Sequence, residues 1–295
     1  MLQLSFSILY QFQCLYIERK LRINFFLYIV FIKIIFAVEL NVLTYNIHGL
    51  SPILAGDNPK VRIPKILNKS NNFDVILIQE NWIFSDDEIA QDLNDYITIV
   101  SNKSKFNKPL KYLLNPNGSG LSLAIKNNIK ILNTDEYSFE LCSGWISKYN
   151  DCFATKGFQY VSIEIGGERV DIYNTHLDAG ESQKDIDVRI SQLESLRNYI
   201  DLHSSSYPLI IAGDMNINFL NKESKKIINQ FMADLNLKMI NWSIDKSNNK
   251  YILDYIFYRP SEKTEITLEQ GGVVSDLLGL SDHPPISGLF DIRKK

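Results

Sequence analysis

The stretch that decides the fold is VDIYNTHLDAGESQKDIDVRISQLESLRNYI, which spans residues 170–200. Residues 170–174 form an apolar run typical of a strand, and residues 188–202 have the spacing of an amphipathic helix. The apolar stripe of that helix comprises Ile190, Leu193, Leu196, Tyr199 and Ile200. Because His176 directly follows the strand, the segment predicts a strand-to-helix unit with an imidazole at its turn.

Similar apolar runs recur along the chain. Runs bounded by polar or turn residues predict further strands at residues 39–45, 75–79, 121–125, 158–165, 209–212, 252–258 and 286–290. A second helix is predicted in NKESKKIINQFMADL, with Asn221 as its N-cap. Strands that alternate with helices favour a layered α/β fold, with two sheets face to face and helices outside.

The composition is that of a globular protein. The chain has 295 residues, of which 45% are apolar and 22% are charged, so it can bury a sizeable core. No repeat or low-complexity tract interrupts the sequence. We therefore expect one folded domain, residues 38–295, after a leader of residues 1–37.

The leader contains an apolar stretch, residues 23–38, which is interrupted only by Asn24 and Lys33. Arg19, Lys20 and Arg22 precede it. The stretch is shorter than the roughly 20 residues that a transmembrane helix needs, and it fits the apolar region of a signal peptide. We therefore expect a signal peptide or hydrophobic leader and a secreted or periplasmic protein. The alternative is a retained membrane anchor.

Removing residues 1–37 would take away four basic residues and one acidic residue, which changes the net charge from −3 to −6. An acidic protein is poorly suited to broad electrostatic capture of a polyanion, so nucleic acid is the less favoured ligand. Of the three cysteines, Cys142 and Cys152 would remain. An oxidising compartment would allow them to pair, and two free buried thiols are the alternative.

Polar side chains end nearly every strong apolar run. The residues that end these runs carry a carboxylate, a carboxamide or an imidazole: Asn46, His48, Glu80, His176, Asp214 and Asn216. Asp254 lies within its run, and Asp282 and His283 immediately precede the last strand. Because strand ends collect along one edge of a sheet, we expect a shared cluster. Oxygen ligands with a few imidazoles suit a hard divalent cation such as Mg²⁺ better than a structural zinc ion. His48 is a weak candidate, and His203 is assigned to the surface.

Spacing adds two expectations about this cluster. Asp214 and Asn216 are two residues apart, so their side chains would point to the same side of an extended segment. Pro284 biases His283 toward an extended backbone, and the adjacent Asp282 and His283 would then diverge. One of these two side chains could contact a metal ion while the other contacts water.

Six motifs resemble those of the endonuclease/exonuclease/phosphatase superfamily, which includes deoxyribonuclease-like enzymes, abasic-site endonucleases, inositol phosphatases and neutral sphingomyelinases. In chain order they are TYNIHG, IQE, NTHLDA, GDMNIN, LDYIFY and LSDHPPI, within residues 39–291. The resemblance implies a four-layer α/β/β/α sandwich of two packed, mainly antiparallel sheets with outer helices. It also implies metal-dependent hydrolysis of a phosphoester.

A narrower stretch, CSGWISKYNDCFATKGFQYVSIEI, resembles the neutral sphingomyelinase branch of this superfamily. In that branch an Asp, four intervening residues and Lys-Gly precede a strand, which is followed by THL and then by an Arg and QL on a helix. The corresponding residues here are Asp151, Lys156, Gly157, His176, Arg189 and Gln192. The chain departs from bacterial sphingomyelinases because residues 260–280 contain no aromatic residue to enter a bilayer. Either another loop contacts lipid or the substrate is a smaller phosphodiester.

The resemblance also implies a role for each polar residue. The predicted metal ligands are Asn46, Glu80 and Asp282. His283 is the predicted general base, and Asp254 orients it and stabilises the imidazolium. The residues predicted to position water and phosphate, or to bind the phosphate, are Asp214, Asn216, His176, Lys156 and Asp151.

These motifs predict a secreted, monomeric, Mg²⁺-dependent phosphodiesterase. Its predicted substrate is a sphingomyelin-type lipid, which would yield phosphocholine and ceramide and would require contact with a membrane surface. One alternative is a nuclease or a phosphoinositide or sugar phosphatase of the same superfamily, although a nuclease would need arginines along its groove. A catalytically inactive binding module is disfavoured because the site residues are all present.

Overall fold

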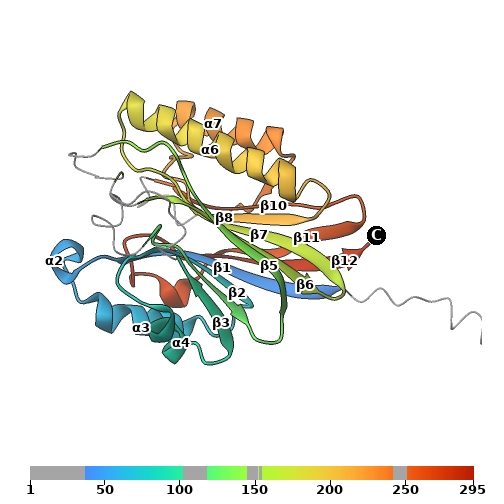
Figure 1. Cartoon of the computed structure of the whole chain (residues 1–295), viewed down its shortest axis with the longest axis horizontal. Coiled ribbons are helices and arrows are strands. Elements are labelled where there is room, and N and C mark those ends of the chain that lie inside the picture. The colour runs from blue at the N-terminus through green and yellow to red at the C-terminus, as the bar shows by residue number, and fades with distance from the viewer. Residues whose placement is uncertain (1–36, 102–117, 145–151, 153–154, 242–250) are drawn as a thin grey trace, which may run out of the picture. The chain divides into compact units, whose positions relative to one another are not determined.

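Two six-stranded sheets pack face to face in the computed structural model, which describes residues 37–101, 118–144, 152, 155–241 and 251–295 (Figure 1). The first sheet has the order β11 (Thr264–Val273), β12 (Ile286–Lys294), β1 (Val38–Gly49), β2 (Val75–Asn81), β4 (Ser122–Lys126) and β3 (Tyr96–Val100). The second has the order β5 (Lys130–Ser138), β6 (Gly157–Ile165), β7 (Glu168–His176), β8 (Leu209–Asp214), β10 (Asp254–Arg259) and β9 (Lys238–Met239). Neighbouring strands are antiparallel, except for the parallel pairs β1–β2 and β7–β8.

Helices cover the outer face of each sheet (Figure 1). On the first sheet these are α3 (Pro59–Lys69) and α4 (Asp86–Asp92), and on the second they are α6 (Gln183–His203) and α7 (Lys222–Asp234). Two short helices, α2 (Pro52–Ala55) and η3 (Ser275–Leu277), lie in connections. The predicted four-layer α/β/β/α sandwich is therefore confirmed.

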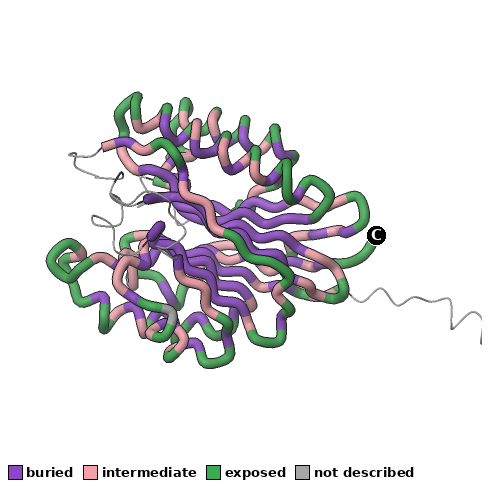
Figure 2. Tube along the Cα trace, viewed as in Figure 1, coloured by how far each residue is buried: buried purple, intermediate pink, exposed green. Residues whose placement is uncertain are grey.

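The core between the sheets is built from the inward side of each strand. Val42, Leu77, Val161, Ile172 and Ile210 are fully buried there. Figure 2 shows the contrast between these buried strands and the exposed outer sides of the helices. Because removal of apolar surface from water drives folding, this core fixes how the two sheets face each other.

A polar contact joins the two sheets just beneath the strand ends. Gln79 on β2 donates its amide hydrogen to Asn174 Oδ1 on β7 at 2.7 Å, and both side chains are buried. Asn174 Nδ2 in turn donates to the carbonyl oxygens of Ile78 and Ser122 at 3.0 and 3.1 Å. Buried amides of this kind require matched partners, so the contact fixes the relative position of the strand tips above it.

The helix starts follow capping chemistry. Asn221 caps α7 by accepting hydrogen bonds from the backbone nitrogens of Glu223 and Ser224, as predicted. Ser182 and Asp185 form a capping box that starts α6 earlier than the predicted residue 188.

The predicted apolar stripe of α6 is wrong at Ile190, which is 37% exposed. Arg189 and Gln192 occupy the buried side instead. Gln192 donates to Asp178 Oδ1 at 2.8 Å, and Arg189 donates to the carbonyl oxygen of Gly180 at 2.8 Å. The helix therefore turns two polar side chains inward because they hold the loop that follows β7.

Every predicted strand is present, and the described residues contain four more that were not predicted. These are β3, β5, β9 and β11, which are the edge strands of the two sheets. The prediction of a leader at residues 1–37 concerns residues that, apart from Ala37, lie outside the described part of the chain. Among the described residues, no helix combines the length and apolar character needed to cross a membrane.

Candidate active site

The ends of three neighbouring strands in the second sheet bring polar side chains together. In the antiparallel pairing of β10 with β8, Asp254 lies opposite Asp214, and in the parallel pairing of β7 with β8, His176 lies opposite Asp214. From the first sheet, Asn46 on β1 donates to Glu80 Oε1 and to Asp214 Oδ2, both at 3.0 Å. The predicted cluster therefore forms, and Asn46 joins its two halves.

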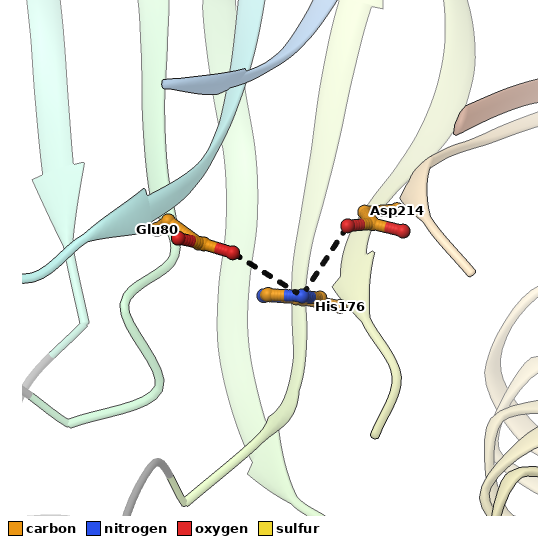
Figure 3. Close-up of side chains that lie close together, drawn as sticks. All are labelled: Glu80, His176 and Asp214. Carbon is orange, nitrogen blue, oxygen red and sulfur yellow. Dashed lines mark ion pairs between the residues drawn. The ribbon is translucent and has the colours of Figure 1, made fainter. Parts of the chain in front are cut away.

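Glu80, His176 and Asp214 form the centre of the cluster (Figure 3). His176 Nε2 lies 3.4 Å from Asp214 Oδ2 and 4.0 Å from Glu80 Oε1, and one ligand atom from each residue lies within 4.8 Å of the others. Burial raises the pKa of Asp214, because a carboxylate removed from water lacks compensation for its charge. Two converging carboxylates and an imidazole fit a hard divalent cation, which would supply that compensation.

A second group, Asp254 with His283, adjoins Asp214. His283 Nδ1 and Asp254 Oδ2 are 2.8 Å apart, and His283 Nε2 is 3.7 Å from Asp214 Oδ2. Burial alone would lower the pKa of His283, but the charges of Asp254 and Asp214 outweigh it and raise the pKa to about 11. Without a cation the imidazole is therefore protonated, and it faces Asp214 through its second nitrogen.

Lys156 and His176 form a buried pair. Lys156 Nζ lies 3.0 Å from His176 Nε2 and donates to the carbonyl oxygen of Leu177 at 2.9 Å. Burial, together with the positive charges of Lys156 and His283, holds the pKa of His176 well below its usual value. His176 is thus neutral; its Nε2 faces both Lys156 Nζ and Asp214 Oδ2, and its buried Nδ1 has no hydrogen-bond partner among the described residues. The positive charge beside the cluster belongs to Lys156.

Asn216 differs from its predicted geometry. β8 ends at Asp214, and Asn216 has a φ of 50°, so the two side chains do not extend from one regular strand. The Asn216 backbone nitrogen donates to Asp214 Oδ1 at 2.9 Å, and its side chain donates to the carbonyl oxygen of Leu177 at 2.9 Å. Asn216 thus orients Asp214 and ties down the segment after His176.

His48, a weak candidate by sequence, stands at the rim of the cluster with Asp282. His48 Nδ1 lies 3.4 Å from Asp282 Oδ2 and 3.7 Å from Glu80 Oε2. The Asp282 side chain is 58% exposed, and it belongs to neither of the two groups above. His48 could have been placed near the cluster from the sequence, because it lies two residues after Asn46 on the same strand. Asp151, the remaining predicted substrate contact, lies outside the described residues.

Backbone strain is concentrated at this site. Five non-glycine residues in the described part of the chain have a left-handed φ, and three of them are His48 at 46°, Glu80 at 58° and Asn216 at 50°. Such conformations cost on the order of 1–3 kcal/mol each and persist where the surroundings impose them. The left-handed backbone at the strand ends therefore directs these three residues toward the cluster.

A cleft of about 1050 Å³ opens beside Asn216, between the first turns of α6 and α7. Its basic lining residues are Arg189, which donates to the backbone, and Lys226, which pairs with Glu223 at 2.7 Å.

Cys142 and Cys152 form a disulfide, which settles the open question of their pairing. Next to it, the Ser143 backbone nitrogen donates to the buried Asp178 Oδ2 at 2.7 Å.

The fold and the strand-end cluster together define a known class of protein. The chain belongs to the Endonuclease/Exonuclease/phosphatase family, whose model matches residues 43–283. Among curated proteins it is 26% identical over 193 residues to a sphingomyelinase of Mycobacterium bovis, covering 63% of this chain and 36% of that protein. It is 24% identical over 202 residues to a sphingomyelinase C of Bacillus cereus, covering 63% of this chain and 59% of that protein. The matched region is therefore less than two thirds of either relative.

Solved structures show the same fold. Beta toxin 275–280 from Staphylococcus aureus superposes with a TM-score of 0.66 at 20% identity, over 84% of this chain and 99% of that one. Sphingomyelinase C from Streptomyces griseocarneus also gives 0.66, at 19% identity, over 85% of this chain and 99% of the other.

Proposed function

We propose that this protein is a divalent-metal-dependent phosphodiesterase that hydrolyses a sphingomyelin-type lipid to phosphocholine and ceramide. The observation that carries the proposal is the convergence of Glu80, Asp214 and His176 beside the His283–Asp254 pair. The curated relatives are named sphingomyelinases, and one structural neighbour is a beta toxin variant with bound magnesium ions.

His283 is the general base in this proposal. Its Nε2 takes a proton from the attacking water, and Asp254 holds Nδ1 and stabilises the imidazolium that forms. The water oxygen bonds to phosphorus as the bond from phosphorus to the ceramide oxygen breaks, and the ceramide oxygen keeps the electron pair of that bond and takes a proton from solvent water. The charges of Asp254 and Asp214 together raise the pKa of His283 to about 11, and a cation that balances Asp214 would lower that pKa and favour the neutral imidazole that a base requires.

The other residues bind and orient. Glu80 and Asp214 would hold the cation, with Asn46 bracing both carboxylates. A bound Mg²⁺ supplies electrostatic stabilisation of the charge that develops on the phosphate oxygens. Lys156, buried beside His176, provides a fixed positive charge for the same oxygens. His176 orients Lys156, and its neutral imidazole is the third group beside the two carboxylates of Glu80 and Asp214.

Secretion and membrane contact are part of the proposal. The disulfide suits an oxidising compartment, which agrees with a signal peptide at residues 1–37.

A hydrolysis panel tests this function. The purified protein is incubated with sphingomyelin, a lysophospholipid, plasmid DNA and phosphoinositides, with Mg²⁺ and with excess chelator. We expect Mg²⁺-dependent release of phosphocholine from sphingomyelin. Cleavage of DNA alone, or equal activity in chelator, would refute the assignment.

A further inference from the structure

The partly buried guanidinium of Arg62 joins β1, the first strand to carry site residues, to the segment that carries His283. Arg62, on α3, donates from Nη1 to the carbonyl oxygens of Ile47 at 2.6 Å and Leu280 at 3.0 Å, and from Nη2 to that of His48 at 2.9 Å. Its side chain is only 13% exposed. Three backbone carbonyl oxygens from two distant parts of the chain therefore accept hydrogen bonds from the same guanidinium group.

Two further hydrogen bonds cross the same joint. Ser281 Oγ donates to the carbonyl oxygen of Asn46 at 2.8 Å, and Tyr45 donates its hydroxyl hydrogen to the carbonyl oxygen of Leu277 at 3.0 Å. Residues 45–48 and 277–281 are thus in direct contact, although more than 200 residues separate them in the chain. Each of these segments runs directly into site residues.

We propose that Arg62 is a positioning residue, which sets the distance between the strand end that carries Asn46 and the segment that carries His283. This inference rests on the proposed function, because it assigns His283 as the base. Arg62 contacts no reacting atom. It acts through the main chain on both sides of the site, where a misplacement of about 1 Å can cost roughly 100-fold in rate.

The geometry explains why this position holds an arginine. A guanidinium offers five donors in a rigid plane, so it can bind three carbonyls and still pair with a carboxylate. That carboxylate is Asp57, which accepts from Arg62 Nε and, at 3.3 Å, from Nη2. An ammonium has three donors on one atom and a flexible stem, so lysine cannot span the same set of carbonyls.

Arg259 provides a matched control. It donates to the carbonyl oxygens of Leu235 and Ser204 at 2.9 and 3.0 Å, so it is also a bridge between backbone segments. In the pairing of β10 with β8, Arg259 lies opposite Leu209, at the far end from Asp254 and Asp214. Its replacement therefore breaks the same kind of contact away from the site.

The experiment compares Arg62→Lys with Arg259→Lys in the full chain. With a soluble phosphodiester and saturating Mg²⁺, Arg62→Lys should lower kcat about 10-fold to 100-fold with little change in KM. Arg259→Lys should stay within about twofold of the original kcat. Amide hydrogen exchange should become at least about 10-fold faster at residues 45–49 and 277–283 in Arg62→Lys alone.

Equal kcat values in the two lysine variants, or unchanged exchange at both segments in Arg62→Lys, would overturn the inference. If Arg62→Lys does not fold, Ser281→Ala tests the same joint, with faster exchange at those segments and a few-fold lower kcat expected. If the unmodified protein hydrolyses no phosphodiester, the proposed function fails, and the exchange measurement still decides whether Arg62 holds the two segments together.

Discussion

The protonation state of His283 makes the stability of the metal-free protein depend on pH in a specific way. Its pKa in the folded protein is about 11, against about 6.5 for an unperturbed histidine in the unfolded chain. A raised pKa means that the folded state binds the extra proton more tightly. The stabilisation from this proton is complete below pH 6.5 and is lost as the pH rises toward 11.

The magnitude follows from proton linkage. Between these two pKa values the folded state holds one more proton than the unfolded state, so the free energy of unfolding falls by about 1.36 kcal/mol per pH unit. At pH 6.5 the unfolded histidine is itself half protonated, so the loss from pH 6.5 to 8.5 is about 2.3 kcal/mol. The comparison begins at pH 6.5 because His176, buried and neutral, adds the opposite slope at lower pH.

Urea unfolding in excess chelator measures this effect. The original protein and His283→Gln are compared at pH 6.5, 7.5 and 8.5, and the difference in unfolding free energy should shrink by about 2.3 kcal/mol across the range. Addition of Mg²⁺ should flatten the slope of the original protein, because a cation beside Asp214 lowers the pKa of His283. Parallel pH dependence in the two proteins would refute the charged His283–Asp254 pair.

Three further outcomes are expected. Glu80→Gln should abolish most hydrolysis because the cation loses a charged ligand, and a rate within threefold of the original at saturating Mg²⁺ would contradict this role. His283→Ala should lower kcat by about 10² to 10⁴ and remove the acidic limb of the pH–rate profile; persistence of that limb would reassign the base. The mature chain should begin near Val38 after export, which N-terminal sequencing of culture supernatant and cell fractions can check, and an intact leader on a cytosolic protein would oppose it.

The sequence predicted strands best where both faces of the strand are buried. Strands such as β2 and β8 are buried along nearly their whole length, so they appear as uninterrupted apolar runs. β5 is mostly exposed and carries Asn133, Asp135 and Glu136, and β9 has two residues. These edge strands form because a neighbour offers free backbone groups, a cause that no local pattern displays.

The sequence predicted most of the residues that converge at the site, although Asp282 belongs to neither group and Asp151 lies outside the described residues. It predicted their geometry less well. Strand ends identified the residues that converge, because the register of β7, β8 and β10 follows from the fold. The left-handed backbones of His48 and Asn216 were not predictable, since tertiary contacts impose them. The role of Arg62 was also hidden, because its partners are main-chain carbonyls, which every sequence contains.

The pairing of β1 with β12 has a consequence for the synthesis of this protein. Val38 lies opposite Ile292 and Thr44 lies opposite Ile286, so β1 pairs with a strand that is synthesised after all the other strands of the two sheets. His283 lies three residues before that strand. A nascent chain therefore cannot bring His283 to the strand-end cluster by this pairing until residues 283–294 have been synthesised.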